Sequence, residues 1–490
     1  MKRSTLLLIL CGCSALLAVS AFAALNETAI VAFLHRGNTV VFDGSRFYPE
    51  KLTVRLGTRV TFVNASNEAF WPASNLHPSH SIYSAFDPQK PIPAGDSWSF
   101  SFTRAGIWGY HDHMKPIVTG TISVLSAEGK EETTIDCTAG ENAACWQQEV
   151  TTALETGGIN PAFDVLSKHL EDNDPKFQEV CHDLTHSIGQ KAYRLFVGKE
   201  ALELSDKVAY CGYGFFHGFM EALLETSGDI NEAHDFCTYV GAALAKSNPH
   251  AVDACYHGIG HGVVDGSDHR AWGNPDALIA PGLELCLKVA PDSNELRQCG
   301  NGVFNALAVA YLNGDYGLSV TDPKEAYAIC ARQSVPEIKT GCYEQMNPIA
   351  ALYGKNDPTK TLSIISTIPQ EADREIAVRT LAGTFMHQGM NDAAYASLIG
   401  ACNTLDSVLS VWCVRGLVTK LIEFGPLGHQ YDIGLSFCAL PLITQEERTG
   451  CYASTVTMTD YLYTKDITKK VCALIANRAP EVAVEDCNAR

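Results

Sequence analysis

The chain has 490 residues, enough for two or more domains, and its 46% hydrophobic and 19% charged residues are typical of a globular protein rather than a disordered one. Lys and Arg number 36 against 55 Asp and Glu, so the formal net charge is −19 at pH 7. A surface this acidic repels phosphate backbones, and we therefore expect no nucleic-acid partner.

Residues 1–23 predict export from the cytoplasm. Lys2 and Arg3 precede a long apolar run that ends at Ala21-Phe22-Ala23, which is the pattern of a secretory signal peptide with an A-x-A cleavage site. The apolar run is also long enough to stay uncleaved as a membrane anchor, and LCGC is a poor match to a lipoprotein box at Cys13. All of these alternatives make the rest of the chain extracytoplasmic, that is, periplasmic, secreted or membrane-anchored.

Residues 24–126 predict an all-β domain. Segments such as TVVFDG, KLTVRLGTRVTFVN and TGTISVLS alternate apolar and polar residues between Gly, Pro and Asn breaks. Short strands at regular intervals favour a small β-sandwich or barrel. The charged, apolar-poor residues 127–136 then predict a linker.

Residues 137–490 predict an all-α domain. Segments such as FDVLSKHL and INEAHDFCTYVGAALAK place apolar residues at the i, i+3, i+4 and i+7 spacing of a helix. Of the 18 cysteines, two lie in the leader and the other 16 lie here. An even number of cysteines in an exported protein predicts disulfides.

Paired cysteines mark a repeat within the helical domain. The two members of each late pair are separated by 11–15 positions, and the first members recur every ~35–45 residues, the period of helix-hairpin solenoids. The predicted disulfides are Cys286–Cys299, Cys330–Cys342, Cys402–Cys413, Cys438–Cys451 and Cys472–Cys487. The spacing leaves open the pairing of Cys137, Cys145, Cys181, Cys211, Cys237 and Cys255.

One repeat lacks both of its cysteines. One period after Cys330 and Cys342 the sequence has Ile365 and Ala377. The two cysteines are missing together, as expected if they bond to each other. This supports disulfides over the alternative of buried thiols.

The β-domain resembles the cupredoxins over most of residues 38–125. The resemblance lies in three segments, FYPEKLTVRLGTRVTFVN, GIWGY at 106–110 and GTISV at 120–124. The last two fit the strands on either side of the family's copper loop. The resemblance implies a Greek-key sandwich. It also puts Asp112 where the family has its copper-binding cysteine, and Phe70 near the place of its first histidine. A blue-copper site needs a thiolate, so it is excluded here.

Four histidines in the same domain predict a different metal site. They lie in two short segments, NLHPSHSIYSAFDP and GYHDHMK, which meet at one end of a cupredoxin sandwich, and they are His77, His80, His111 and His113. Imidazole nitrogens suit copper(II), with zinc as the alternative metal. The other interpretation is that these side chains cap strand ends and bond to backbone carbonyls.

Three successive helix starts carry a second set of candidate ligands. Each contributes a pair at i and i+4, which shares one helix face, and the residues are His182, His186, His217, Glu221, His257 and His261, followed by Asp265. Stacked repeats would bring these faces together as a zinc, copper or iron site. Glycines among them, such as Gly218 and Gly260, would let the helices approach closely. The alternatives are core histidines bonded between repeats and a metal-free catalytic cluster.

This helical part resembles an uncharacterised bacterial family of Cys/His-rich repeats with C-H-x-x-x-H and C-x-H-G-x-G-H-G motifs. The resemblance implies the architecture and no reaction. The sequence has no H-E-x-x-H, C-x-x-C-H, G-x-S-x-G or Walker motif, and so it does not say whether the protein is an enzyme.

Two histidine clusters in an exported chain predict a copper-binding metalloprotein that handles copper or takes part in redox chemistry. The alternative is a non-catalytic repeat scaffold that binds a protein or a glycan. A second alternative is a secreted metallohydrolase centred on the helical histidines. The sequence does not specify the metal or a protein partner.

Overall fold

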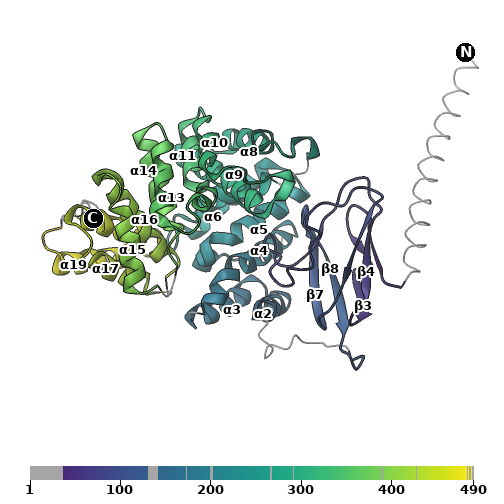
Figure 1. The fold of residues 1–490 in the computed structure, drawn as a ribbon. Helices are drawn as coiled ribbons and strands as arrows, with labels where there is room; N and C mark the ends of the chain where they lie inside the picture. The colour runs from purple at the N-terminus through teal and green to yellow at the C-terminus, as the bar shows by residue number, and fades with distance from the viewer. Residues whose placement is uncertain are drawn as a thin grey trace, which may run out of the picture. The chain divides into compact units, whose positions relative to one another are not determined.

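The computed structural model describes residues 37–130, 142–172, 174–198, 202–264, 268–290, 292–387, 390–425, 428–482, 484 and 487. The predicted leader, residues 131–136 of the predicted linker, Cys137 and Asp265 lie outside the described residues. The chain divides into two compact units between Cys145 and Trp146. A β part followed by a disulfide-linked all-α part is confirmed (Figure 1).

The first unit holds two four-stranded sheets, with the strand orders β2-β1-β4-β6 and β3-β8-β7-β5. Parallel pairs join β1 to β4 and β3 to β8, and the other pairs are antiparallel. The strands are β1 (Thr39–Phe42), β2 (Phe47–Tyr48), β3 (Lys51–Arg55), β4 (Arg59–Asn64), β5 (Pro72–Ser74), β6 (Ser97–Ser101), β7 (Gly106–Asp112) and β8 (Lys115–Leu125).

Aromatic side chains from alternate strand positions fill the core of this unit. The Phe62 ring on β4 packs edge-on against Tyr110 on β7, with centroids 5.3 Å apart, and both are fully buried. Gly120 on β8 leaves room for that tyrosine, because a Cβ at this position would lie 2.4 Å from its hydroxyl. The β7–β8 pair that carries His111 is thus held by the core beneath it.

The second unit is a series of helices. They are α2 (Asn142–Gly157), α3 (Ile159–Glu171), α4 (Pro175–Val197), α5 (Tyr210–Thr226), α6 (Ile230–Leu244), α7 (Ala251–Val263), α8 (Pro275–Val289), α9 (Ser293–Asn313), α10 (Ala328–Ala331), α11 (Pro336–Gln345), α12 (Asn347–Ala351), α13 (Pro358–Leu362), α14 (Glu371–Gly383), α15 (Asp392–Cys402), α16 (Ser407–Glu423), α17 (Gln430–Cys438), α18 (Gln445–Leu462) and α19 (Lys465–Arg478). None of the helices in the described part of the chain combines the length and apolar character needed to cross a bilayer.

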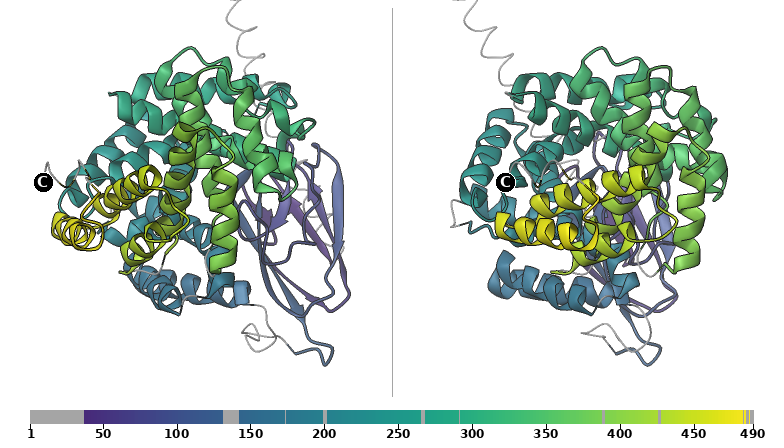
Figure 2. Two further views of the ribbon diagram at one scale, coloured as in Figure 1. Left: turned by 60° about the vertical axis from the view of Figure 1, so that its left-hand side comes forward. Right: turned by 90° about the vertical axis from the view of Figure 1, so that its left-hand side faces the viewer.

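These helices form two layers of a solenoid. One helix from each repeat packs on the equivalent helix of the next repeat, in the order α4, α5, α7, α9, α11, α14, α16, α18. The partner helices pack against this row, with α6 on α7, α8 on α9, α15 on α16 and α17 on α18. Figure 2 shows the repeats following one another from teal to yellow. The row contains all three helices that carry the predicted helical ligands.

Short polar side chains begin many of the helices. The Asp292 carboxylate accepts the backbone N–H of Glu295 at the start of α9, and Thr444 and Glu447 form a capping box at the start of α18. Such caps satisfy N–H groups that have no partner within the helix. The turns between repeats are therefore encoded locally.

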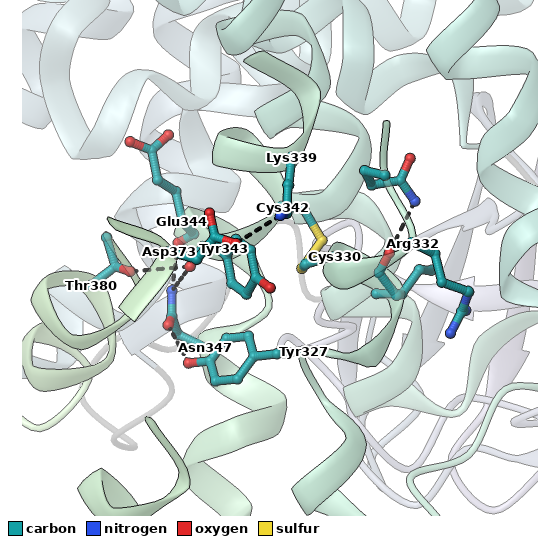
Figure 3. The surroundings of a disulfide bond; sticks show 12 residues. Tyr327, Cys330, Arg332, Lys339, Cys342, Tyr343, Glu344, Asn347, Asp373 and Thr380 are labelled. Carbon is teal, nitrogen blue, oxygen red and sulfur yellow. Dashed lines mark hydrogen bonds and ion pairs between the residues drawn. A yellow bond between two sulfur atoms is a disulfide. The ribbon is translucent and has the colours of Figure 1, made fainter. Parts of the chain in front are cut away.

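Disulfides recur along the solenoid, where Cys181–Cys211 joins α4 to α5 and most of the others join the two helices of one repeat. Figure 3 shows the Cys330–Cys342 bond between α10 and α11, where the Lys339 ammonium also pairs with the Asp373 carboxylate at 2.7 Å. The bonds in the described residues are Cys181–Cys211, Cys237–Cys255, Cys286–Cys299, Cys330–Cys342, Cys402–Cys413, Cys438–Cys451 and Cys472–Cys487. In the repeat without cysteines, Ile365 and Ala377 are fully buried.

Candidate metal centres

The structure brings the four histidines of the first unit together. We call His77, His80, His111 and His113 the β cluster; one nitrogen from each ring lies within 4.8 Å of the others. His111 is in β7 and His113 follows that strand, while His77 and His80 lie in the loop between β5 and β6. Three of the four are buried and His77 is half-buried.

The loop that carries His77 and His80 is anchored by its apolar side chains. Leu76, Tyr83 and Phe86 are buried in the unit, and the backbone N–H of Ser74 donates to the Phe86 carbonyl at 2.9 Å. The Tyr83 N–H donates to the Ser74 hydroxyl at 3.0 Å. The loop therefore holds its histidines against the end of β7 in a fixed geometry.

The nitrogen spacings of the β cluster suit a bound transition-metal ion. His77 Nδ1 lies 3.3 Å from His111 Nε2, and His80 Nε2 lies 2.9 Å from His113 Nδ1. An ion about 2.0–2.1 Å from each nitrogen places two nitrogens about 3.3 Å apart in a tetrahedron and about 2.9 Å apart in a square. The spacings fit zinc and copper(II) alike.

The outer nitrogens of two of these rings bond to protein oxygens. His80 Nδ1 lies 2.8 Å from Asp87 Oδ2, and His111 Nδ1 lies 3.1 Å from Asn75 Oδ1. Both oxygens accept, so both rings carry the proton on Nδ1 and direct the Nε2 lone pair into the cluster. Burial would raise the pKa of Asp87, but its contacts with His80, helped by hydrogen bonds from Gln89 and Trp71, outweigh this and keep the pKa below the usual value. Asn75 and Asp87 were not predicted from the sequence, although both lie in the segment NLHPSHSIYSAFDP together with His77 and His80.

Asp112 lies between two residues of the β cluster but bonds elsewhere. Its Oδ1 accepts the backbone N–H of Trp71 at 2.8 Å and of Met114 at 3.2 Å. Burial raises the pKa of this carboxyl to about 6. The carboxylate therefore ties the strand end that carries His111 and His113 to the start of the neighbouring strand.

The structure also assembles the histidines of the second unit. We call His182, His186, His217, Glu221, His257 and His261 the helical cluster. One nitrogen from each of His182, His186 and His217 lies within 4.8 Å of the other two. The His217 ring stacks on the rings of His257 and His261, with centroids 4.9 and 4.3 Å apart.

Protein oxygens also hold the outer nitrogens of the helical cluster. His182 Nδ1 lies 2.7 Å from the Cys211 carbonyl oxygen, and His257 Nδ1 lies 2.7 Å from Asn301 Oδ1. His182 Nε2 in turn faces His217 Nδ1 at 3.2 Å. The sequence analysis missed Asn301, which stands two residues after Cys299 as His257 stands two after Cys255.

Electrostatics keep most of these imidazoles neutral. Burial, reinforced by neighbouring histidines, lowers the pKa of His182 and of His257 to about 3 and holds the pKa of His217 well below its usual value. Burial also opposes the charging of His186, but the carboxylates of Glu221 and Asp183 together outweigh it and raise the pKa of His186. Neutral imidazole is the form that binds metals.

Glycines bring the helices of the helical cluster close together, as the sequence predicted. A Cβ at Gly218 in α5 would lie 2.0 Å from the His186 carbonyl oxygen of α4, and one at Gly302 in α9 would lie 1.9 Å from the His257 carbonyl oxygen of α7. No side chain fits in these spaces. The backbone of each ligand-bearing helix therefore lies almost against the next one.

A cavity of about 260 Å³ reaches the edge of the helical cluster at His182. Its wall includes the Cys181–Cys211 disulfide, the Glu423 carboxylate at the end of α16 and the Tyr463 side chain after α18. The late helices can line it because α18 comes back to α5, where the Tyr461 and Tyr213 rings are 5.8 Å apart. The cavity gives a small molecule a route to the first imidazole of the cluster.

No protein-family model matches the chain. No curated protein matches it either. Solved structures are weakly similar to a small part of it. The purple cupredoxin from Nitrosopumilus maritimus is 21% identical, with 18% of this chain and 97% of that chain covered and a TM-score of 0.16. An oxidised amicyanin variant is 20% identical, with 18% and 81% covered and a TM-score of 0.16. A reduced amicyanin variant is 21% identical, with 18% and 79% covered and a TM-score of 0.16.

Proposed function

We propose that this protein binds copper outside the cytoplasm through the four imidazoles of the β cluster. The observation that carries the proposal is the convergence of four ring nitrogens within 4.8 Å, with Asp87 and Asn75 on the outer nitrogens of two rings. Outer-nitrogen bonds of this kind are common at metal sites because they fix the tautomer and the ring orientation. Direct hydrogen bonding between the rings is the competing explanation of the short nitrogen distances.

Copper(II) suits this donor set best. Imidazole binds copper(II) more strongly than it binds the other divalent ions of the first transition row, and the 2.9 Å spacing matches neighbouring corners of a square. The sequence has no cysteine between Cys13 and Cys137, so the site would lack the thiolate that makes copper proteins blue. We propose a colourless, nitrogen-only copper site, with zinc as the alternative occupant.

The helical cluster is proposed as a second metal site, for zinc, copper or iron. Its imidazoles come from three successive helices of one row, and their neutral form favours metal binding. A protein with both sites would serve in copper handling or in redox chemistry. The seven disulfides described suit an oxidising, extracytoplasmic location, and we propose that the protein is periplasmic, secreted or anchored by its leader.

The proposal is tested by metal analysis of purified protein reconstituted with copper(II) and freed of excess ion. The full chain should retain copper, and His111→Ala combined with His113→Ala should lose the copper of the β cluster. His257→Ala combined with His261→Ala should keep that copper and lose the metal of the second site. Unchanged metal content and thermal stability in both double variants would favour the alternative of a binding scaffold without metals.

The cavity at His182 favours one further candidate, a metallohydrolase. Its volume of about 260 Å³ equals the liquid volume of about nine waters, enough for a small substrate beside an imidazole of the helical cluster. The test is hydrolysis of a panel of ester, amide and phosphoester substrates by metal-loaded protein. Activity that a chelator abolishes and metal restores would support the candidate, and no turnover with metal bound would reject it.

A further inference from the structure

Glu221 lies at the centre of the helical cluster and contacts two of its imidazoles. Its Oε2 is 3.3 Å from His186 Nδ1 in α4, and its Oε1 is 3.3 Å from His261 Nδ1 in α7. The glutamate itself belongs to α5, one turn after His217, and it is buried. One carboxylate therefore connects the helices on either side of its own.

These contacts determine which ring nitrogens can bind a metal. An ionised carboxylate has no proton to donate, so the nitrogens that face it must be the donors. A neutral imidazole with its proton on Nδ1 has its lone pair on Nε2, at the opposite edge of the ring. His186 is thus held with Nε2 directed away from Glu221, whereas His261 makes an ion-pair contact at 3.3 Å and not a hydrogen bond. The Nε2 of His186 is buried and makes no hydrogen bond within the described part of the chain.

The other two anchored rings of the cluster follow the same rule with neutral acceptors. His182 Nδ1 donates to the Cys211 carbonyl and His257 Nδ1 donates to Asn301 Oδ1. The outer Nδ1 of His182, His186 and His257 is therefore bonded to an oxygen, and one nitrogen from each of His182 and His186 lies within 4.8 Å of one from His217. Glu221 supplies that oxygen for His186 and also contacts His261.

We propose that Glu221 is a positioning residue of the helical cluster rather than a metal ligand, so that the site is built from imidazole nitrogen alone. The inference rests on the proposed second metal site and narrows its chemistry. Nitrogen-only donors select borderline ions such as copper(II) and zinc, and they disfavour hard ions such as magnesium, calcium and manganese(II). This differs from the expectation that Glu221 would bind the metal directly.

The test uses the full chain with His111→Ala and His113→Ala, so that only the helical cluster can bind metal. The affinity for copper(II) and for zinc is measured by competition with a chelator, in this parent and in Glu221→Ala. Loss of an outer-nitrogen partner at a metal site costs about 10–100-fold in affinity. We expect a loss of this size for both ions.

Pulsed EPR of the copper-loaded proteins separates a positioning role from a ligand role. The parent should show only nitrogen donors, and Glu221→Ala should keep them while the couplings of the remote Nδ1 nitrogens change. A carboxylate oxygen donor in the parent that disappears in Glu221→Ala would overturn the inference. Equal affinity in the two proteins would overturn it as well.

A matched control removes another buried glutamate. Glu447 in α18 accepts hydrogen bonds from the Ser410 hydroxyl and from the backbone N–H of Thr444. Neither of these recorded partners is a histidine. Glu447→Ala should lower stability and leave the copper spectrum and affinity unchanged.

If the parent itself binds neither ion, the proposed second site fails. If it binds and Glu221→Ala binds equally, only the role of Glu221 fails.

Discussion

At the scale of single residues, the side chains that surround the histidines determine how each imidazole is oriented and which of its nitrogens can bind a metal. Asp87, Asn75 and Asn301 each accept from an outer imidazole nitrogen and so determine which inner nitrogen carries the lone pair. Asp112 acts differently, because its oxygen bonds to backbone N–H groups. It therefore fixes the strand end that carries His111 and His113.

Replacing Asp112 tests that distinction. Asp112→Ala leaves the buried N–H groups of Trp71 and Met114 without their acceptor, and we expect it to lower the free energy of unfolding by about 2–4 kcal/mol. Asp112→Asn keeps an acceptor oxygen and should cost much less. Both variants should retain the copper of the β cluster, measured by metal analysis beside chemical denaturation. Loss of copper from Asp112→Asn would instead make Asp112 a ligand.

The residues that support the sites were harder to predict than the candidate ligands. Histidines two or four positions apart share a strand or helix face, so the spacing of His111 and His113, or of His182 and His186, predicts a common direction. Asn75 has no comparable mark, because a single asparagine is common in turns. Asn301 repeats the position of His257 relative to its cysteine, but this spacing alone does not show that its oxygen reaches a ring. Only the folded chain brings these oxygens to the rings.

At the scale of elements, close helix packing holds the helical cluster together. In Gly218→Ala the new methyl group would meet the His186 carbonyl oxygen, so α5 must move away from α4. We expect a loss of about 1–3 kcal/mol in the free energy of unfolding. We also expect weaker metal binding at the helical cluster, since His217 moves with α5.

Gly400→Ala is the control for this prediction. Gly400 lies in α15, and a Cβ there has no atom within 4 Å. Alanine in place of a helical glycine without such crowding stabilises by about 0.5–1 kcal/mol. Thermal stability should therefore move in opposite directions for the two variants, and only Gly218→Ala should bind metal more weakly in a titration. A Gly218→Ala protein with normal metal affinity would show that the close approach is unimportant for the site.

The disulfide beside the helical cluster should affect both stability and metal binding, whereas a disulfide far along the solenoid should affect stability alone. Cys181→Ala with Cys211→Ala removes the bond that fixes the Cys211 carbonyl near His182. Cys438→Ala with Cys451→Ala removes a bond between α17 and α18, neither of which carries a residue of the helical cluster. Each pair should cost about 2–4 kcal/mol in stability. Only the first should weaken metal binding, and equal metal affinities would contradict this account.

The repeats themselves were predictable, and one local feature was not. Cysteine spacing and helical periodicity both reflect the same hairpin unit, so the sequence indicated the solenoid by two independent signals. The start of α5 was not expected: Cys211, Gly212 and Tyr213 have left-handed backbone angles, with φ of 55°, 70° and 62°. Non-glycine residues rarely adopt this conformation, and it places the Cys211 carbonyl within reach of His182.

At the scale of the whole molecule, the two units rely on different sources of stability. The β sheets pack around aromatic side chains and contain no cysteine, whereas disulfides recur along the helical repeats from Cys181 to Cys487. A reductant should therefore destabilise the two parts unequally. In hydrogen exchange with mass spectrometry on the full, chelator-treated chain, dithiothreitol should reduce protection in α9 and α16 and leave β4 and β7 unchanged. Equal loss in both parts would contradict this.

The composition of the whole chain and the change from period two to helical periodicity were enough to predict a β part followed by an α part. The fold of each part follows from local hydrophobic patterns that repeat many times, and this repetition allows them to be recognised in the sequence. A metal centre depends on a few contacts between distant segments, for example His77 with His111 or His182 with His217. The sequence could nominate these residues, but their distances required the fold.

The most direct test of copper binding at the β cluster is EPR, both continuous-wave and pulsed. The sample is the full chain reconstituted with one equivalent of copper(II), and the comparison is the variant with His111→Ala and His113→Ala. We predict a type 2 signal with imidazole nitrogen couplings and no intense blue absorption. The double variant should lose this signal, while any signal from the helical cluster persists. A full chain that retains no copper, or whose copper signal is identical in the double variant, would contradict it.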